Sequence, residues 1–552
     1  MSSAKEPVMR RFGNGLTVLI KEDKSHPVVS LQYWVGTGSM NEGHWQGSGL
    51  SHLLEHLVFK GTAHFSGQEL ARKVQERGGH WNAYTSVNRT VYYIDGPAES
   101  WQIFLNLLTE LVFFPTFPED EMEREKEVVR REMAMYADDP DSVAYQLLMQ
   151  TLYLKHPCRW PVLGERAAFD CLTRQDVLDY HASRYVPNNV VLSIAGDVDA
   201  AEILSHLELL VEDLKSRPLN REPIPHEPHQ FGSRRVRKEF AVPYSKLHLA
   251  WRLPCSAHPD TPALSALSSI LGGGRSARFY EKFHDRLGLV YSIEVHSNQS
   301  ETDEGAFTIS MDVDRAQRDK VRDLVLQELR NLAEEDFTED LKRVCKQTRV
   351  SRLRRRSSAS GVASEMGADW FGSRNLNLSS EWQEAIERVT TEDLHRVCST
   401  WLSSPNVTEV SLDPPGSNAG DEERASASAG TALSEHVLGN GMKVVIREDH
   451  RLPLAYACMA FKAGCRAENE HDAGVTDLMS ECLLKGTSTR SAADIARFLE
   501  DIGGAINTST GNNSLSVGCQ VLAEDLDAGL ELMADVVMNP SFPEDAFLRE
   551  KE

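Results

Sequence analysis

Two histidines and a glutamate stand close together in the segment GLSHLLEHLVFKGT, residues 49–62. An α-helix turns once every 3.6 residues, so His52, Glu55 and His56, at positions i, i+3 and i+4, project from one face. Imidazoles and carboxylates are the groups that proteins use to bind zinc and to move protons. The spacing predicts a helix that holds a metal ion, and the alternative is a core helix whose histidines only make hydrogen bonds.

A zinc site needs at least one further ligand from another part of the chain. The segment EREKEVVRREMAMYADDP, residues 123–140, offers Glu125 and Glu132, which are seven residues apart and therefore lie on one face of a helix. The alternative interpretation is a solvated charged helix. We treat these two glutamates as candidate partners of the histidines.

The sequence repeats itself over a distance of about 425 residues. Residues 12–29, FGNGLTVLIKEDKSHPVV, match residues 438–455, LGNGMKVVIREDHRLPLA, at an offset of 426 (Gly441 against Gly15). Residues 47–62 match residues 472–487 at an offset of 425 (Lys485 against Lys60), so one residue is missing from the second copy in between. A repeat of this length indicates a duplicated unit.

The second copy lacks the chemistry of the first. His52, Glu55 and His56 are replaced there by Asp477, Ser480 and Glu481, although the surrounding apolar framework is retained. The second copy is therefore expected to serve packing or enclosure. Because it stops at Glu552, the counterpart of Glu127, we expect the natural protein to continue further.

Changes in composition divide the chain. A proline-rich stretch lies near residues 215–235, and a stretch rich in Gly, Ser and Ala follows the first copy. Adjacent strands followed by helices predict an α+β fold of repeated two-layer domains, each with a largely antiparallel sheet and helices on one face. The predicted parts are a domain at 7–215 that carries His52, Glu55 and His56, a second domain at 230–412 that lacks them, a flexible linker at 413–433 and an incomplete, degenerate repeat at 434–552.

Charge and hydropathy exclude several classes of function. The net charge of −23 argues against nucleic acid as a partner, because phosphate-binding surfaces need an excess of lysine and arginine. No apolar run approaches the roughly 20 residues that a membrane span requires. The first residues lack the pattern of a secretory signal, and the nine cysteines form no CxxC pairs, so we expect a cytoplasmic location.

The order H-x-x-E-H reverses the thermolysin-type motif and is the signature of the inverzincins. With it, the sequence resembles the pitrilysin family of zinc metallopeptidases, which includes mitochondrial processing peptidase and insulin-degrading enzyme. Further segments that resemble this family follow in the expected order: GGHWNAYTSVNRTVYYIDG at 78–96, HPCRWPVLGE at 156–165, YVPNNVVLSIAGDVD at 185–199 and LGGGRSARFYEKFHDRLGLVYSI at 271–293.

The resemblance implies a zinc endopeptidase that hydrolyses peptide bonds of short or unfolded peptides with a metal-activated water. In the family, a glutamate about 75 residues after the second histidine completes the zinc site, and Glu132 stands at the matching place after His56. His52, His56 and Glu132 would then hold zinc, with Glu55 as the general base. Glu125 resembles a supporting glutamate that orients a ligand.

The family also implies a mode of substrate binding. Residues 81–86, WNAYTS, resemble an edge strand to which an extended peptide adds by backbone hydrogen bonds, which makes Asn82, Ala83, Tyr84 and Thr85 candidate substrate contacts. Tyr291 matches a substrate-binding tyrosine of the family, but His284 replaces the arginine that normally accompanies it. Family members form a two-half clamshell, so a dimer or pairing with a second half is expected to close a chamber.

Two other functions remain open from the sequence. A non-catalytic scaffold or assembly subunit would explain the fold, but the intact H-x-x-E-H motif argues against it. A metal-dependent lyase acting on a small molecule is a more distant possibility. Manganese or cobalt would also fit ligands of this type.

Overall fold

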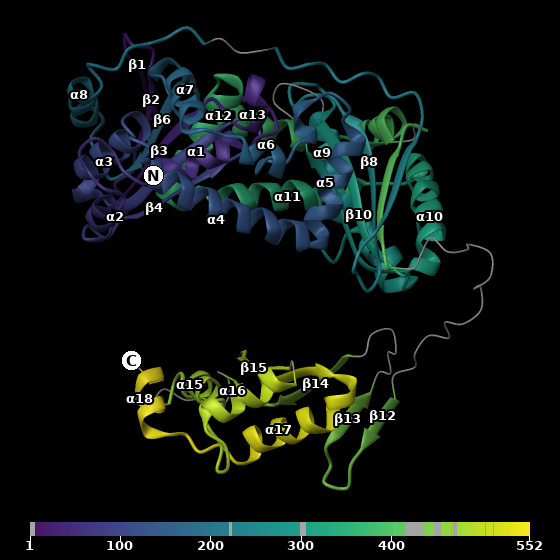
Figure 1. Cartoon of the computed structure of the whole chain (residues 1–552). Coiled ribbons are helices and arrows are strands. Elements are labelled where there is room, and N and C mark those ends of the chain that lie inside the picture. The colour runs from purple at the N-terminus through teal and green to yellow at the C-terminus, as the bar shows by residue number, and fades with distance from the viewer. Residues whose placement is uncertain are drawn as a thin grey trace. The chain divides into compact units, whose positions relative to one another are not determined.

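The computed structural model describes residues 6–219, 223–298, 305–402, 405–415, 434–446 and 454–551, except residues 465, 467, 469–471, 503 and 512. The chain divides into two compact units, Met1–Glu423 and Arg424–Glu552 (Figure 1). The predicted linker at 413–433 lies, beyond residue 415, outside the described residues.

The larger unit contains two sheets, and the first is built from β1 (Val8–Arg11), β2 (Thr17–Glu22), β3 (Val28–Val35), β4 (His80–Thr85), β5 (Thr90–Pro97) and β6 (Val190–Gly196). Their order across the sheet is β1-β2-β6-β3-β5-β4. Only the β2–β6 pair runs parallel. Strand β4, which carries the WNAYT residues, therefore forms one edge of the sheet.

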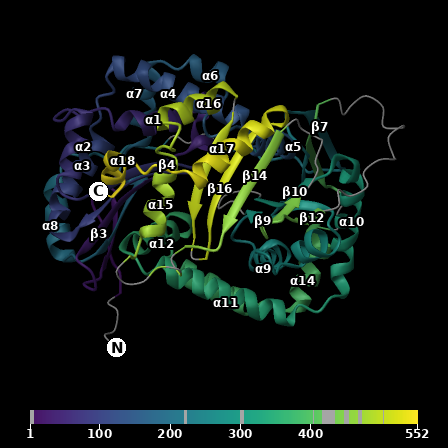
Figure 2. The ribbon, with the colours of Figure 1, turned by 90° about the horizontal axis from the view of Figure 1, so that it is seen from below.

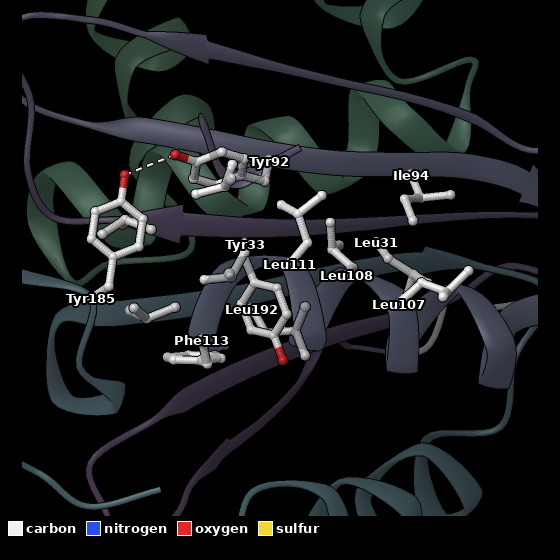
Figure 3. Close-up of a cluster of buried hydrophobic side chains, with 14 of the residues drawn as sticks. Leu31, Tyr33, Tyr92, Ile94, Leu107, Leu108, Leu111, Phe113, Tyr185 and Leu192 are labelled. Carbon is white, nitrogen blue, oxygen red and sulfur yellow. Dashed lines mark hydrogen bonds between the residues drawn. The ribbon is translucent and has the colours of Figure 1, made fainter. Parts of the chain in front are cut away.

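The first part of the chain also supplies α1 (Leu50–Val58), α2 (Gly67–Gln75), α3 (Trp101–Phe113), α4 (Glu119–Asp138), α5 (Pro140–Leu152), α6 (Arg166–Asp170), α7 (Arg174–Arg184) and α8 (Ala200–Leu210). Apolar residues of α1 and α3 pack on one face of the first sheet. Figure 3 shows part of this core, in which the Tyr92 and Tyr185 hydroxyls are 2.8 Å apart. Burying these polar atoms in pairs satisfies their hydrogen bonds.

The second sheet contains β7 (Arg234–Glu239), β8 (Ser245–Leu253), β9 (Val290–Asn298), β10 (Gly305–Val313) and β11 (Thr408–Asp413). Its order is β7-β11-β8-β10-β9, with only β7 and β11 parallel. The helices of this part are α9 (Thr261–Gly272), α10 (Arg318–Asn331), α11 (Thr338–Arg355), α12 (Ala359–Ser373), α13 (Leu378–Glu387) and α14 (Thr391–Val397).

The two halves of the larger unit exchange a helix. Helix α12, from the second half, places Val362 and Met366 against Trp34 on the face of the first sheet opposite to α1 and α3. Helix α5, from the first half, places Leu148 and Leu152 against the second sheet (Figure 1). The sequence prediction had each domain cover one sheet face with its own helices, so the structure adds a second helical layer drawn from the other half.

The smaller unit resembles the start of the first half. It contains the β12–β13 pair and a three-stranded sheet in the order β14-β16-β15, on which helix α17 packs (Figure 2). Its elements are β12 (Ser434–Val437), β13 (Lys443–Ile446), β14 (Leu454–Phe461), α15 (Val475–Leu483), α16 (Ala492–Asp501), β15 (Ala505–Thr510), β16 (Leu515–Leu522), α17 (Leu526–Met538) and α18 (Glu544–Lys551).

The predicted α+β class with largely antiparallel sheets is confirmed. The helix predicted to carry His52, Glu55 and His56 is α1, and Glu125 and Glu132 lie together on helix α4 as predicted. None of the described helices combines the length and the apolar composition needed to cross a membrane.

Candidate metal centre and peptide site

Helix α1 has one face buried in the core, and the two histidines lie on its partly exposed face. Its buried side chains belong to the core of the first half, whereas His52, Glu55 and His56 are only partly buried. The helix begins after Gly49, which has a left-handed backbone and no side chain to cap it. The buried side chain of Glu42 caps the N-terminus of the helix instead, because its Oε1 accepts a hydrogen bond of 2.8 Å from the Ser51 amide.

Helix α4 brings Glu132 to the histidines. Glu132 Oε2 lies 3.8 Å from His52 Nε2 and 3.9 Å from His56 Nε2. The ligand atoms of the three side chains all lie within 4.8 Å of one another, and among the described residues no other group of three such side chains is so close. Tetrahedral zinc places nitrogen and oxygen ligands roughly 3.4 Å apart, so the group fits zinc after a small inward movement.

The electrostatics of the group suit a cation. Burial, with the neighbouring His56, lowers the pKa of His52 to about 3, so its imidazole is neutral, as a metal ligand must be. Burial also raises the pKa of Glu132, against the opposing effect of His56. A bound cation would stabilise this carboxylate in its ionised form.

Glu125 lies directly behind His56. Its Oε2 is 3.1 Å from His56 Nδ1, and its Oε1 is 2.6 Å from the ammonium group of Lys60. Burial alone would raise the pKa of Glu125, but the hydrogen bonds from His56 and Lys60 lower it. An ionised Glu125 accepts a hydrogen bond from the Nδ1–H group of His56, which leaves Nε2 facing Glu132.

Glu55 is held by strand β4. Its Oε2 accepts a hydrogen bond of 2.5 Å from the Thr85 hydroxyl. Burial raises the pKa of Glu55, and Glu132 adds to this shift, whereas Thr85 and His56 oppose it. A carboxyl group whose pKa is moved toward neutral is suited to accept and return a proton.

An open pocket of about 330 Å³ lies between α1 and strand β4. Asn82 lines it beside Glu55 and His56, and the rings of Phe59 and Trp81 pack edge to face in its wall. Along β4 the exposure of side chains alternates, so Ala83 and Thr85 lean toward the protein while Tyr84 is 41% exposed. The predicted substrate strand thus borders the histidine helix.

Tyr291 lies elsewhere in the larger unit. It stands on β9 of the second sheet, where its ring packs 5.3 Å from that of Tyr244. It is not among the residues that line the pocket beside Glu55. His284, which replaces the arginine expected from the family, stacks on Tyr280 instead.

The smaller unit keeps the framework of the site without its ligands. Helix α15 presents Asp477, Ser480 and Glu481, as the repeat predicted, and Asp477 accepts a hydrogen bond of 2.7 Å from Thr510, the counterpart of Thr85. A histidine pair is therefore missing at a position whose surroundings are otherwise retained.

Sequence reasoning missed Lys60 and Glu42. Both left a signal in the repeat, because Lys60 corresponds to Lys485 and Glu42 to Glu468. Glu468 accepts hydrogen bonds from the amides of Gly474 and Thr476 and so caps α15 much as Glu42 caps α1. The residue missing from the second copy therefore lies between this glutamate and the helix.

Comparisons with known proteins identify the family to which this chain belongs. The family model for Insulinase (Peptidase family M16) matches residues 17–166 and 443–552, and that for the Peptidase M16 inactive domain matches residues 172–347. An uncharacterized zinc protease of Rickettsia felis is 27% identical, over 71% of this chain and 94% of that protein. An uncharacterized zinc protease of Mycobacterium bovis is 30% identical, over 53% and 67% respectively.

The solved structure of a protease from Helicobacter pylori is 26% identical, with a TM-score of 0.69, and covers 74% of this chain and 100% of that one. The fold and these matches define a chain with the M16 peptidase fold, and the relatives above are named zinc proteases. The chain belongs to peptidase family M16, and the resemblance to the pitrilysin family is confirmed.

Proposed function

We propose that this chain is a zinc-dependent endopeptidase that hydrolyses peptide bonds of short or unfolded peptides. The observation that carries the proposal is the convergence of His52, His56 and Glu132 within 4.8 Å, with Glu55 on the same helix face. Two nitrogen ligands and one carboxylate leave a position open for water, as catalytic zinc sites require. The relatives named zinc proteases support the same activity.

Each side chain has a role that follows from its position. His52, His56 and Glu132 would hold the ion, and zinc supplies Lewis-acid activation of water and of the substrate carbonyl. Glu55 takes the proton of the attacking water and later returns it to the leaving amine. Glu125 holds His56 in the tautomer that leaves Nε2 free for the metal.

The substrate would bind along strand β4. An edge strand offers unpaired backbone groups, and an extended peptide can add to them beside Glu55. Folded proteins rarely present such a segment, which restricts substrates to short or unfolded chains. The pocket with Phe59 and Trp81 would receive an apolar side chain. The pairing with a second half that closes a chamber stays a prediction.

The test is hydrolysis of a quenched-fluorescent peptide by the wild type and by Glu55→Gln, with zinc content measured in both. Loss of the general base should reduce kcat by about 100-fold or more while the zinc remains bound. Ser480→Ala, at the counterpart of Glu55 in the smaller unit, is the matched control and should retain activity. Equal hydrolysis by the wild type and Glu55→Gln would contradict the role of Glu55 as general base, and hydrolysis by neither would favour the non-catalytic scaffold.

A further inference from the structure

A cavity of about 690 Å³ opens in the larger unit where helix α12 ends. Thr17 of β2 and Val191 of β6 form part of its floor, together with Trp370 near the end of α12. Successive side chains of a strand point to opposite faces of the sheet. The next residues along these strands, Val18 and Leu192, belong to the core beneath α1. The cavity therefore lies on the opposite face of the sheet from the histidine helix and is separate from the proposed peptide site.

The backbone at the end of α12 takes an unusual conformation. Helix α12 ends at Ser373, and Arg374 follows in the left-handed region, with φ 59° and ψ 21°. This region costs a non-glycine residue about 1 kcal/mol, and glycine usually occupies such a position after a helix. Strain of this kind often marks a residue kept for its side chain.

Two exposed arginines line the cavity, and no anionic side chain among the described residues pairs with them. Arg11 reaches it from the end of β1 and Arg374 from the end of α12. The lining contains no aspartate or glutamate, and neither guanidinium makes a hydrogen bond or ion pair within the described part of the chain. Burial and the charge of Arg11 hold the pKa of Arg374 below its usual value. In a protein with 82 acidic and 59 basic residues, such a pair is not explained by a general excess of positive charge.

Neutral donors accompany the arginines. The Asn41 side-chain oxygen accepts a hydrogen bond from the Gly38 amide, so its NH₂ group is left as a donor. Trp370 Nε1 is buried and has no hydrogen-bond partner among the described residues. Among the described residues that line the cavity, guanidinium and asparagine side chains offer N–H groups and none is a carboxylate, which suits a ligand that only accepts hydrogen bonds.

We propose that this cavity binds a multivalent oxyanion, with phosphate or carboxylate groups, between Arg11 and Arg374. Guanidinium groups pair with both kinds of oxyanion through parallel hydrogen bonds. A cavity of about 690 Å³ is of the size that small-molecule ligands occupy. A bound oxyanion would reduce the repulsion between the two guanidinium groups. No other group in the described lining carries a negative charge that could do so.

The test is isothermal titration of the full chain with sulfate and with succinate, at constant ionic strength held with chloride. We expect saturable binding of at least one probe to the wild type and about tenfold or greater weakening in Arg11→Gln and Arg374→Gln. Arg349→Gln on α11 is the matched control, since Arg349 is exposed and likewise makes no hydrogen bond or ion pair among the described residues. Binding of sulfate alone assigns a phosphate-type ligand, and binding of both assigns divalent oxyanions in general.

Arg374→Gly separates a binding role from a structural one. Glycine relieves the left-handed strain, so this variant should be at least as stable as the wild type while losing the anion. The proposal is overturned if neither probe binds, if the double variant Arg11→Gln/Arg374→Gln binds as the wild type does, or if Arg349→Gln weakens binding equally. None of these outcomes depends on whether the chain is a peptidase.

Discussion

The ammonium group of Lys60 lies 2.6 Å from a carboxylate oxygen of Glu125 and ties the turn that follows helix α1 to helix α4. In the smaller unit, Lys485 and Glu550 form the same ion pair at 2.7 Å between the turn that follows α15 and helix α18. Because α15 carries neither histidine, the ion pair does not require a metal. It fixes the helix that bears the histidines against the helix that bears Glu132.

Replacing Lys60 by methionine should therefore weaken zinc binding. Glu125 would lose a partner and orient His56 less firmly, and changes of this kind lower metal affinity by about tenfold or more. Competition with a chromogenic chelator measures the affinity. Lys485→Met is the matched control and should leave zinc binding unchanged, so an equal loss in both variants would contradict the role given to Lys60.

Removing the hydroxyl that holds Glu55 should slow catalysis. Thr85→Val keeps the shape of the side chain but deletes the 2.5 Å hydrogen bond. Hydrogen bonds to charged groups contribute about 1.5–3 kcal/mol, so kcat/KM should fall about 10- to 100-fold. Thr85→Ser should retain most activity, and wild-type kinetics in Thr85→Val would show that Glu55 needs no such support.

Glu42 should make stability depend on pH. Burial raises its pKa to about 8, from an ordinary value of 4.5. The folded state therefore holds a proton that the unfolded state releases, and stability falls as pH rises from about 4.5 to 8. In thermal unfolding, the stability of Glu42→Gln relative to the wild type should increase over this pH range, by on the order of a few kcal/mol. A difference in melting temperature that does not grow with pH would contradict this.

The exchanged helix α12 should tolerate little change where it touches the first sheet. Gly367 packs so closely on Trp34 that an added Cβ would overlap the indole ring. Glycine to alanine in a helix normally stabilises by about 1 kcal/mol, but here overpacking should destabilise by about 1–3 kcal/mol. A higher melting temperature for Gly367→Ala would show that α12 does not pack on the sheet in this way.

Sequence reasoning predicts the local features of the site well. The spacing of His52, Glu55 and His56 fixes their common face once a helix forms, and the same periodicity places Glu125 and Glu132 together on α4. These two placements, of the His52, Glu55 and His56 side chains on α1 and of the two glutamates on α4, depend only on helix geometry and on the family resemblance. The family resemblance implied an edge position for the strand at 81–86, and β4 does lie at the edge of the sheet.

Relationships between distant segments could not be predicted in this way. Helix α12 has an apolar stripe, but nothing in its sequence states that Met366 packs on Trp34 of the other half. Likewise, Arg11 and Arg374 meet at one cavity although they are far apart in the chain. Such pairings depend on the tertiary arrangement, which periodicity does not encode.

The most direct test of the central claim is the zinc content of the purified chain, measured by elemental analysis for the wild type, Glu132→Gln and Asp477→Asn. Asp477 replaces His52 in the smaller unit and so controls for general effects of removing a carboxylate. We predict one zinc per chain in the wild type and in Asp477→Asn, and markedly less in Glu132→Gln. No zinc in the wild type, or a full complement in Glu132→Gln, would contradict the assignment of His52, His56 and Glu132 as the metal site.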